Sequence, residues 1–133
     1  IHISAKTGQN VDQVLEAIVE RIPAPTSPLA TEHLDVALAD IPTRALIFDS
    51  YYDDYRGVIL YVRVVDGQIK KGDAIHMMAT GANGLALEVG HLSPGMIPDP
   101  SLDTGEIGYI VTNLKTTREA RVGDTVTLRK YMV

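Results

Sequence analysis

Histidines, serines and clustered carboxylates are the residues through which this chain could do chemistry, and their spacing gives little support to a catalytic or metal site. The four histidines lie far apart and form no H-E-x-x-H pair: His2, His33, His76 and His91. A metal site therefore has little support, and no serine lies in the G-x-S-x-G setting of a hydrolase nucleophile. Three aspartates and three tyrosines crowd residues 49–55. Nothing nearby would drive two carboxyl pKa values apart, so we expect this cluster to be structural or to dock a partner.

The motifs that bind nucleotide phosphates are missing. A phosphate-binding loop needs G-x-x-x-x-G-K-[ST], in which backbone N–H groups surround the phosphates and the lysine reaches the terminal ones. The dipeptide Gly-Lys does not occur here, and neither does the N-K-x-D motif that recognises a guanine base. We therefore expect no nucleotide hydrolysis by these residues alone.

Length and composition indicate one domain of ordinary size with some appended structure. The 133 residues are 45% apolar and 22% charged, and none is cysteine. No signal peptide is visible in these residues, and no run approaches the roughly 18 apolar residues of a membrane helix. A soluble, cytoplasmic protein is the expectation. The chain begins at Ile1 rather than Met, which favours a segment of a longer protein.

Charge is distributed unevenly along the chain. Most of the formal net charge of −5 belongs to residues 1–43, which hold six acidic and two basic residues. Residues 115–133 carry a local excess of +3, from Lys115, Arg118, Arg121, Arg129 and Lys130 against Glu119 and Asp124. Coating by nucleic acid needs many convergent cations and is not expected, but this segment could make a local contact to RNA.

The first 22 residues have the pattern of a strand followed by an amphipathic helix. Ile1-His2-Ile3 alternates like a strand and runs into Ser4-Ala5-Lys6-Thr7-Gly8. Apolar residues then recur at helical spacing and predict one apolar face: Val11, Val14, Leu15, Ile18, Val19 and Ile22. We expect Asn10 to be the N-cap, with Gln13 completing a capping box, and Pro23 to end the helix.

Residues 23–43 contain four prolines and are typical of a partly ordered linker. Leu34, Leu38 and Ile41 could form a short helical turn within it.

Residues 44–133 have the pattern of a mainly β fold, a closed antiparallel β-barrel with six or seven short strands. The predicted strands are 45–49, 58–65, 74–78, 85–92, 105–112 and 125–129. In the second of them, four apolar residues can share one face: Val58, Leu60, Val62 and Val64. Asp66-Gly67 and Asn83-Gly84 are hairpin signals. Residues 93–103 hold three prolines and predict a loop.

Three stretches resemble translational GTPases of the LepA family. Ser4-Ala5-Lys6 before a helix resembles the S-A-K motif of GTPases. The stretch ALIFDSYYDDYRGVILYVRVVDGQIKKGD, residues 45–73, looks very like the start of the second domain of LepA proteins. Arg121-Val122-Gly123-Asp124 is similar to the closing turn of that barrel. The resemblance implies that residues 1–22 end a GTP-binding domain, residues 23–43 are a linker and residues 44–133 are the second domain.

The resemblance implies a ribosome-binding GTPase as the whole protein, using GTP or GDP and Mg²⁺. Such factors favour back-movement of tRNAs or rescue stalled, tRNA-bearing elongation complexes, and their second domain rests on the small ribosomal subunit. In the S-A-K motif the alanine N–H faces the guanine oxygen while the serine and lysine shape the loop, and these roles pass to Ala5, Ser4 and Lys6. Asp54-Tyr55-Arg56-Gly57 matches the D-x-x-G switch motif, but it follows S-A-K instead of preceding it, so we interpret it as a turn between strands. The family also allows peripheral membrane association, for which these residues offer no support.

The resemblance also makes three basic residues candidates for contact with rRNA phosphates: Lys115, Arg118 and Arg121. Such contacts position a protein on RNA without recognising its sequence. The opposing interpretation is a solvated loop paired with Glu119. The fragment alone is expected to be monomeric and to bind no GTP.

Two further interpretations stay open. One is the second domain of another translational GTPase, of the BipA or elongation factor G type, against which the DSYYDDYRG stretch favours LepA. The other is a free-standing OB-like barrel for nucleic acid, which would want aromatic residues interleaved with Lys and Arg. Aromatic residues are only 5% of the chain, and half of the six tyrosines lie in residues 51–55.

Overall fold

Short alternating strands build a barrel from residue 44 onward. The computed structural model describes residues 1–26 and 40–132. Its strands are β1 (Arg44–Asp53), β2 (Gly57–Asp66), β3 (Gln68–Lys70), β4 (Ala74–Met77), β5 (Asn83–Ser93), β6 (Gly95–Pro98), β7 (Ser101–Asp103), β8 (Ile107–Thr112) and β9 (Thr125–Leu128). The helical elements are α1 (Val11–Arg21) and the 3₁₀ turns η2 (Thr117–Glu119) and η3 (Arg129–Tyr131).

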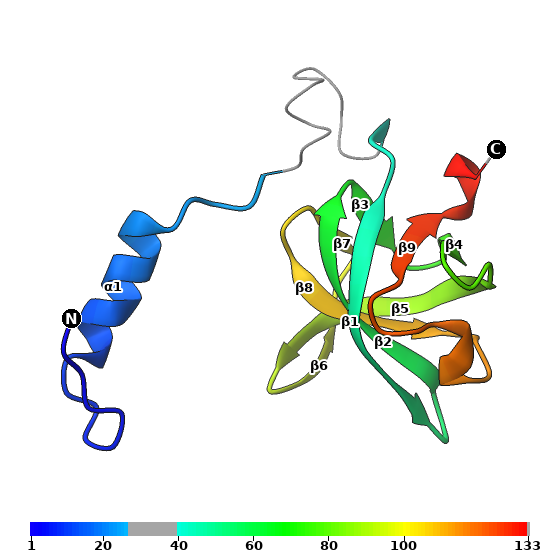
Figure 1. Cartoon of the computed structure of the whole chain (residues 1–133). Coiled ribbons are helices and arrows are strands. Elements are labelled where there is room, and N and C mark those ends of the chain that lie inside the picture. Colours follow the sequence, from blue (N-terminus) through cyan, green and yellow to red (C-terminus); the bar gives the residue numbers. More distant parts are fainter. Residues whose placement is uncertain (27–39, 133) are drawn as a thin grey trace.

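Six of the described strands close into an antiparallel barrel (Figure 1). Its order is β4-β9-β1-β2-β8-β5, and pairing of β4 with β5 completes the ring. The hairpin strand β6 extends from β5, and β3 pairs with β7 in a small second sheet. The predicted mainly β fold with a closed antiparallel barrel is confirmed.

The barrel core forms because one face of each strand points inward. Val58, Leu60, Val62 and Val64 are fully buried in it, as their alternation predicts. A second, smaller cluster of buried side chains lies apart from this core: Ile59, Tyr109 and Val111. Since Ile59 alternates with the inward residues of β2, this second cluster belongs to the outer side of the wall.

One hairpin prediction was right in its two strands but misplaced the turn, since β4 and β5 do pair, and the other was wrong. Asn83 and Gly84 lie inside β5, paired with His76 and Ile75, and the turn comes earlier, where Gly81 takes a φ of +74°. Asp66-Gly67 makes no hairpin, because β2 pairs with β1 and β8 whereas β3 pairs with β7. Gly67 does have a positive φ, but it connects β2 to β3, and these two strands do not pair with each other.

The loop predicted for residues 93–103 is also corrected, because it contains β6 and β7. Prolines suggested a loop, yet Pro98 ends β6, the edge strand of its sheet, opposite Gly90. An edge strand tolerates a residue that cannot donate to a ladder.

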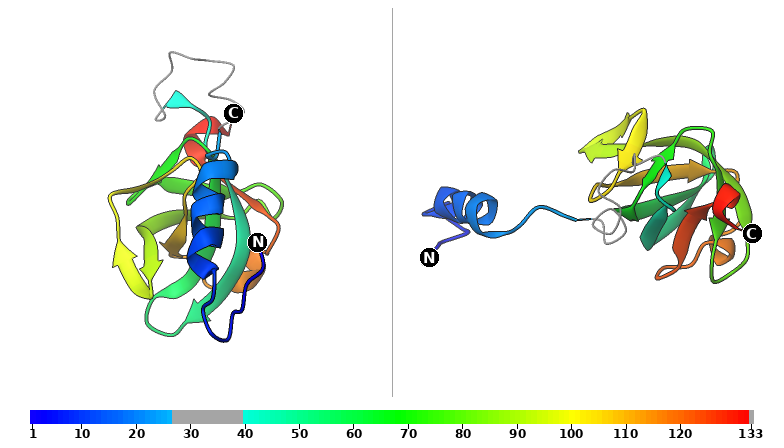
Figure 2. Two further views of the ribbon diagram at one scale, coloured as in Figure 1. Left: turned by 90° about the vertical axis from the view of Figure 1, so that its left-hand side faces the viewer. Right: turned by 90° about the horizontal axis from the view of Figure 1, so that it is seen from above.

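The N-terminal residues form a tight loop and one helix. Residues 1–3 form no strand within the described part, and Ser4 makes only an isolated bridge with Gln9. Asn10 occupies the N-cap position of α1 as predicted, but its side chain makes no capping hydrogen bond. The residue is left-handed (φ 58°), and its side-chain amide donates to the His2 carbonyl oxygen at 2.9 Å instead. Helix α1 buries none of its residues, and the right-hand view of Figure 2 shows it apart from the barrel. Among the described residues, no helix has the length and apolar character needed to cross a membrane.

Both described ends of the proline-rich segment contact the barrel. Ile41 and Thr43 are buried, and the Thr43 hydroxyl donates to the Gln68 carbonyl oxygen at 2.9 Å. Arg44 forms an ion pair with the buried carboxylate of Asp66. The predicted turn at Leu34 and Leu38 lies outside the described residues.

Candidate nucleic-acid interface

The three predicted contact cations lie on one loop between β8 and β9. Lys115, Arg118 and Arg121 flank or belong to η2, and all three are exposed. In the described part of the chain none of them takes part in an ion pair. Their charges therefore face solvent without a neutralising carboxylate.

A capping box holds this loop in shape. Glu119 Oε2 accepts the backbone N–H of Lys115 at 3.0 Å and that of Thr116 at 3.1 Å. Thr116 is the N-cap of η2, and its side chain accepts the backbone N–H of Glu119 at the same end of the turn. Glu119 therefore accepts backbone N–H groups. In the described residues it does not form the pairs with the cationic side chains that the alternative interpretation expected.

Asp124 ties the loop to the neighbouring β4–β5 turn. Its carboxylate is almost fully buried and accepts the backbone N–H groups of Ala79 at 2.8 Å and Thr80 at 3.3 Å. The Thr80 hydroxyl donates to the Glu119 carbonyl oxygen at 2.6 Å. Because both turns are cross-linked, the cations project from a rigid base.

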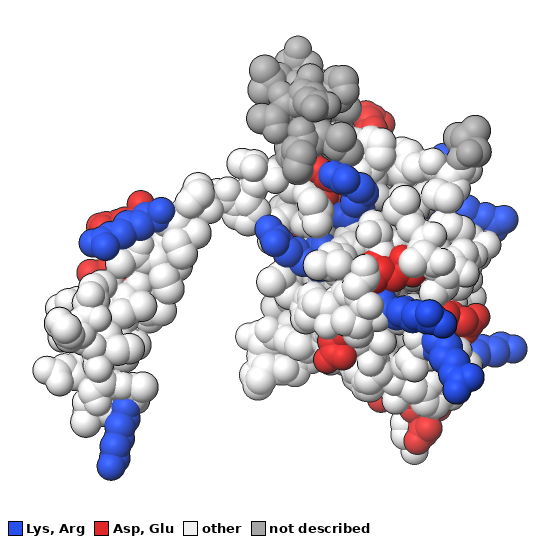
Figure 3. Space-filling view, viewed as in Figure 1, with Lys and Arg blue, Asp and Glu red and all other residues white. Residues whose placement is uncertain are grey.

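Between the two turns lies an open depression of about 360 Å³, lined by Ala79, Thr80, Ala82, Arg118, Glu119 and Arg121. In Figure 3, Lys and Arg side chains gather on the side of the barrel that carries η2 and β9. Point charges on a fixed loop beside a depression suit phosphate groups more than base edges.

The other predicted site, Ser4-Ala5-Lys6, lies before α1 and away from these cations. The Ser4 hydroxyl accepts the Thr7 N–H at 3.4 Å, and the Gly8 N–H donates to the Ser4 carbonyl oxygen at 2.9 Å. Ala5 and Lys6 are exposed. The Ala5 N–H has no partner in the described part of the chain, so it is available to an acceptor.

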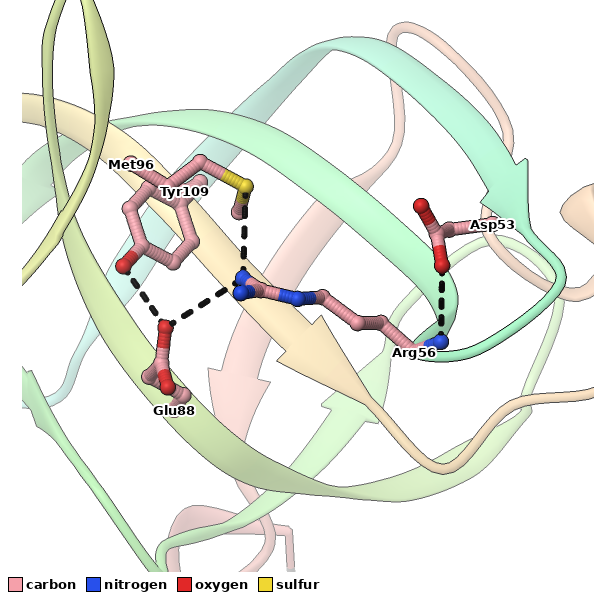
Figure 4. Close-up of polar contacts among 5 residues, drawn as sticks. All are labelled: Asp53, Arg56, Glu88, Met96 and Tyr109. Atoms are coloured by element: carbon pink, nitrogen blue, oxygen red, sulfur yellow. Dashed lines mark hydrogen bonds and ion pairs between the residues drawn. The ribbon is translucent and has the colours of Figure 1, made fainter.

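A polar network that sequence reasoning missed lies on the outer wall (Figure 4). Tyr109 donates from its hydroxyl to Glu88 Oε1 at 2.7 Å, and Arg56 Nη1 lies 3.7 Å from the same oxygen and 3.5 Å from Met96 Sδ. Asp53 holds the turn by accepting the N–H groups of Tyr55 and Arg56, both at 2.8 Å. Only the barrel register brings these residues together, so no local pattern could have revealed them.

Burial raises the pKa of Tyr109, and its hydrogen bond to Glu88 adds to the effect. Burial likewise raises the pKa of Tyr61, with a further contribution from Tyr51, whose ring stacks on it at 5.8 Å. Both phenols are held neutral, which suits packing rather than acid–base chemistry. The predicted turn at residues 54–57 is present, and Tyr55 at its tip is fully exposed.

No group of three His, Asp or Glu side chains in the described residues is placed to hold a metal ion.

Comparison with known proteins gives consistent matches. The family model for Elongation factor Tu domain 2 matches residues 57–127. Elongation factor 4 of Cutibacterium acnes is 50% identical over 96% of this chain, and that of Thermobifida fusca is 52% identical over the same share. The chloroplastic translation factor GUF1 homolog of Arabidopsis thaliana is 53% identical, also over 96%. The chain spans 17% of this plant protein and 19% of the two bacterial ones.

Solved structures agree in fold. The bacterial selenocysteine-specific elongation factor EF-Sec has a TM-score of 0.71 at 15% identity, covering 98% of this chain and 20% of its own. Elongation factor SelB of Methanococcus maripaludis has a TM-score of 0.69 at 13% identity, covering 96% and 25%. The chain belongs to the Elongation factor Tu domain 2 family, and within it is similar to elongation factor 4.

Proposed function

We propose that this chain is part of a ribosome-binding translational GTPase of the elongation factor 4 type, and that its barrel positions the factor on the small ribosomal subunit. The observation that carries the proposal is the rigid loop that presents Lys115, Arg118 and Arg121 without carboxylate partners in the described residues. Such a loop can neutralise rRNA phosphates, whereas mobile surface charges contribute less.

In this proposal the chain has three parts. Residues 1–22 end the GTP-binding domain, residues 23–43 connect it, and residues 44–133 are the second domain. Ser4, Ala5 and Lys6 close over the guanine base, and the exposed Ala5 N–H supports that role. GTP or GDP and Mg²⁺ are then held mainly by the rest of the protein.

The whole factor would act on tRNA-bearing elongation complexes, favouring back-movement or rescue of stalled ribosomes, and would hydrolyse GTP there. It would work where its ribosomes are, in the cytoplasm or, as the name of the Arabidopsis relative indicates for that protein, in a chloroplast.

The test is binding of the full-length factor to isolated small subunits over a range of salt concentrations. Replacing Lys115, Arg118 and Arg121 by alanine should weaken binding and reduce the slope of log K against log salt by as much as about 0.7–0.9 for each lost phosphate contact. The matched control replaces three other exposed cations, Arg63, Lys70 and Lys71, which removes the same charge from the β2–β3 corner. Equal effects of the two triple variants would contradict a specific contact by the η2 loop.

A further inference from the structure

The short loop that presents Ser4, Ala5 and Lys6 is closed by backbone hydrogen bonds. The Ser4 N–H donates to the Gln9 carbonyl oxygen at 3.2 Å, and these two residues form an isolated antiparallel bridge. The Gly8 N–H donates back to the Ser4 carbonyl oxygen at 2.9 Å. Both polar groups of the Ser4 backbone are therefore held within the loop.

The direction of the free Ala5 N–H follows from the hydrogen bond at Ser4. The Ser4 carbonyl and the Ala5 N–H belong to one planar trans peptide, so they point in opposite directions. Since the carbonyl is held toward Gly8 inside the loop, the N–H points out of it. This N–H has no backbone partner within the described residues, and Ala5 is exposed. A donor that is already aimed binds an acceptor at a smaller ordering cost.

Asn10 follows the loop in a backbone conformation that glycine usually takes. Its φ of 58° and ψ of 15° are left-handed, and every other residue with positive φ in the described part of the chain is a glycine. Asparagine tolerates this region better than most residues, but some strain remains. Such strain is kept where the surrounding structure requires it, and it gathers at functional sites.

The Asn10 side chain joins the two arms of the loop. Its Nδ2 donates to the His2 carbonyl oxygen at 2.9 Å, and it makes no capping hydrogen bond to α1. The two residues flank the Ser4–Gln9 bridge, so their contact extends that bridge outward. A glycine would adopt the left-handed backbone without strain but could not make this bond. The bond is therefore what asparagine adds at this position.

We propose that Asn10 is a positioning residue for the recognition of guanine, acting on the Ala5 N–H through the His2 carbonyl and the bridge at Ser4. This inference rests on the proposed function, in which the loop closes over the base. It adds a residue outside the S-A-K motif and assigns the part of the base that depends on it, the oxygen at C6. Asn10 acts from the far side of the loop and makes no contact of its own with the base.

Two substitutions separate the side-chain bond from the backbone strain. Asn10→Asp keeps the size of the side chain and its tolerance of the left-handed region, but a carboxylate oxygen replaces the donor. Asn10→Gly removes the strain and the bond together. Asn83→Asp is the matched control, because Asn83 is also exposed and lies in β5 of the barrel.

The first measurement is the affinity of the full-length factor for GDP and for 6-thio-GDP, which carries sulfur in place of the oxygen at C6. Sulfur is the weaker acceptor. Both Asn10 variants should weaken GDP binding by about three- to tenfold, the worth of one hydrogen bond, and 6-thio-GDP binding by less than about twofold. The ratio of the two dissociation constants should therefore shrink. A loop that merely unfolds more often would weaken both nucleotides equally and leave that ratio unchanged.

The second measurement is hydrogen exchange of the Ser4 and Gly8 amides in the 133-residue chain without nucleotide. Both amides should exchange several-fold faster in the Asn10 variants than in the parent chain or in Asn83→Asp. Unchanged exchange would overturn the proposal, and so would an unchanged ratio of dissociation constants. A parent factor that binds no guanine nucleotide would refute the proposed function as well. A parent that binds GDP, with variants that keep its ratio, would refute only the role of Asn10.

Discussion

The Tyr109 hydroxyl donates to Glu88 Oε1 on the outer wall of the barrel, joining β8 to β5 at 2.7 Å. Tyr109 is fully buried although it points away from the main core. Arg56 reaches the same carboxylate from the β1–β2 turn. This contact therefore couples two strands and the β1–β2 turn outside the barrel interior, through a tyrosine that can titrate.

Stability should fall at high pH because of this tyrosine. The pKa of Tyr109 is raised above 10.0 in the folded state, so the unfolded chain loses this proton first. The contribution is complete below about pH 10 and is lost as pH rises toward the folded-state value, with a slope approaching about 1.4 kcal/mol per pH unit. Urea unfolding between pH 7 and 11 measures it. Tyr109→Phe should flatten the decline, whereas Tyr55→Phe at the exposed turn should leave it unchanged; the same decline in all three proteins would refute this account.

Core burial predicts a sharp contrast within β8. Ile110 is fully buried in the main core, whereas Ile107 on the same strand is 62% exposed. Ile110→Ala should lower the free energy of unfolding by about 2–5 kcal/mol, since it leaves a cavity in a packed barrel. Ile107→Ala should change it by less than about 1 kcal/mol. Thermal unfolding of the 133-residue chain checks both, and similar losses would mean that Ile110 is not a core residue.

The strands could be predicted where apolar residues share one face at a two-residue period. The prediction of turns failed where pairing with distant strands decides the register. Val58, Leu60, Val62 and Val64 occupy every second position of β2, so their shared inward face could be predicted from the two-residue period. Asn83-Gly84 carried the stronger local turn signal, but pairing of β4 with β9 and β5 fixed a register that places the turn at Gly81. From the sequence, the cationic loop could be recognised only by its excess of positive charge. Its rigidity depends on Asp124 reaching residues 79 and 80, a contact separated by more than 40 positions in sequence.

Asp124 should be the residue that keeps this loop rigid. Asp124→Ala leaves the N–H groups of Ala79 and Thr80 without their acceptor in a partly buried site, a loss of about 1–3 kcal/mol. Asp124→Asn keeps one carbonyl oxygen and should lose less. Hydrogen exchange at Ala79 and Thr80, together with urea unfolding, provides the measurement. Asp54→Ala at an exposed turn position is the control, and an equal loss there would exclude a bracing role for Asp124.

Two glycines test whether the N-terminal segment is seated on the barrel. Gly105 and Gly123 have φ values of +87° and +90°, so an alanine at either position costs roughly 1–2 kcal/mol of backbone strain. Only Gly105 faces another segment, because a Cβ there meets Pro25 while one at Gly123 meets open space. Gly105→Ala should therefore displace residues 23–26 and speed proteolytic cleavage near them several-fold, beyond its loss of stability. Gly123→Ala should lose similar stability without that change, so equal cleavage rates in the two variants would show that Pro25 does not rest on Gly105 in solution.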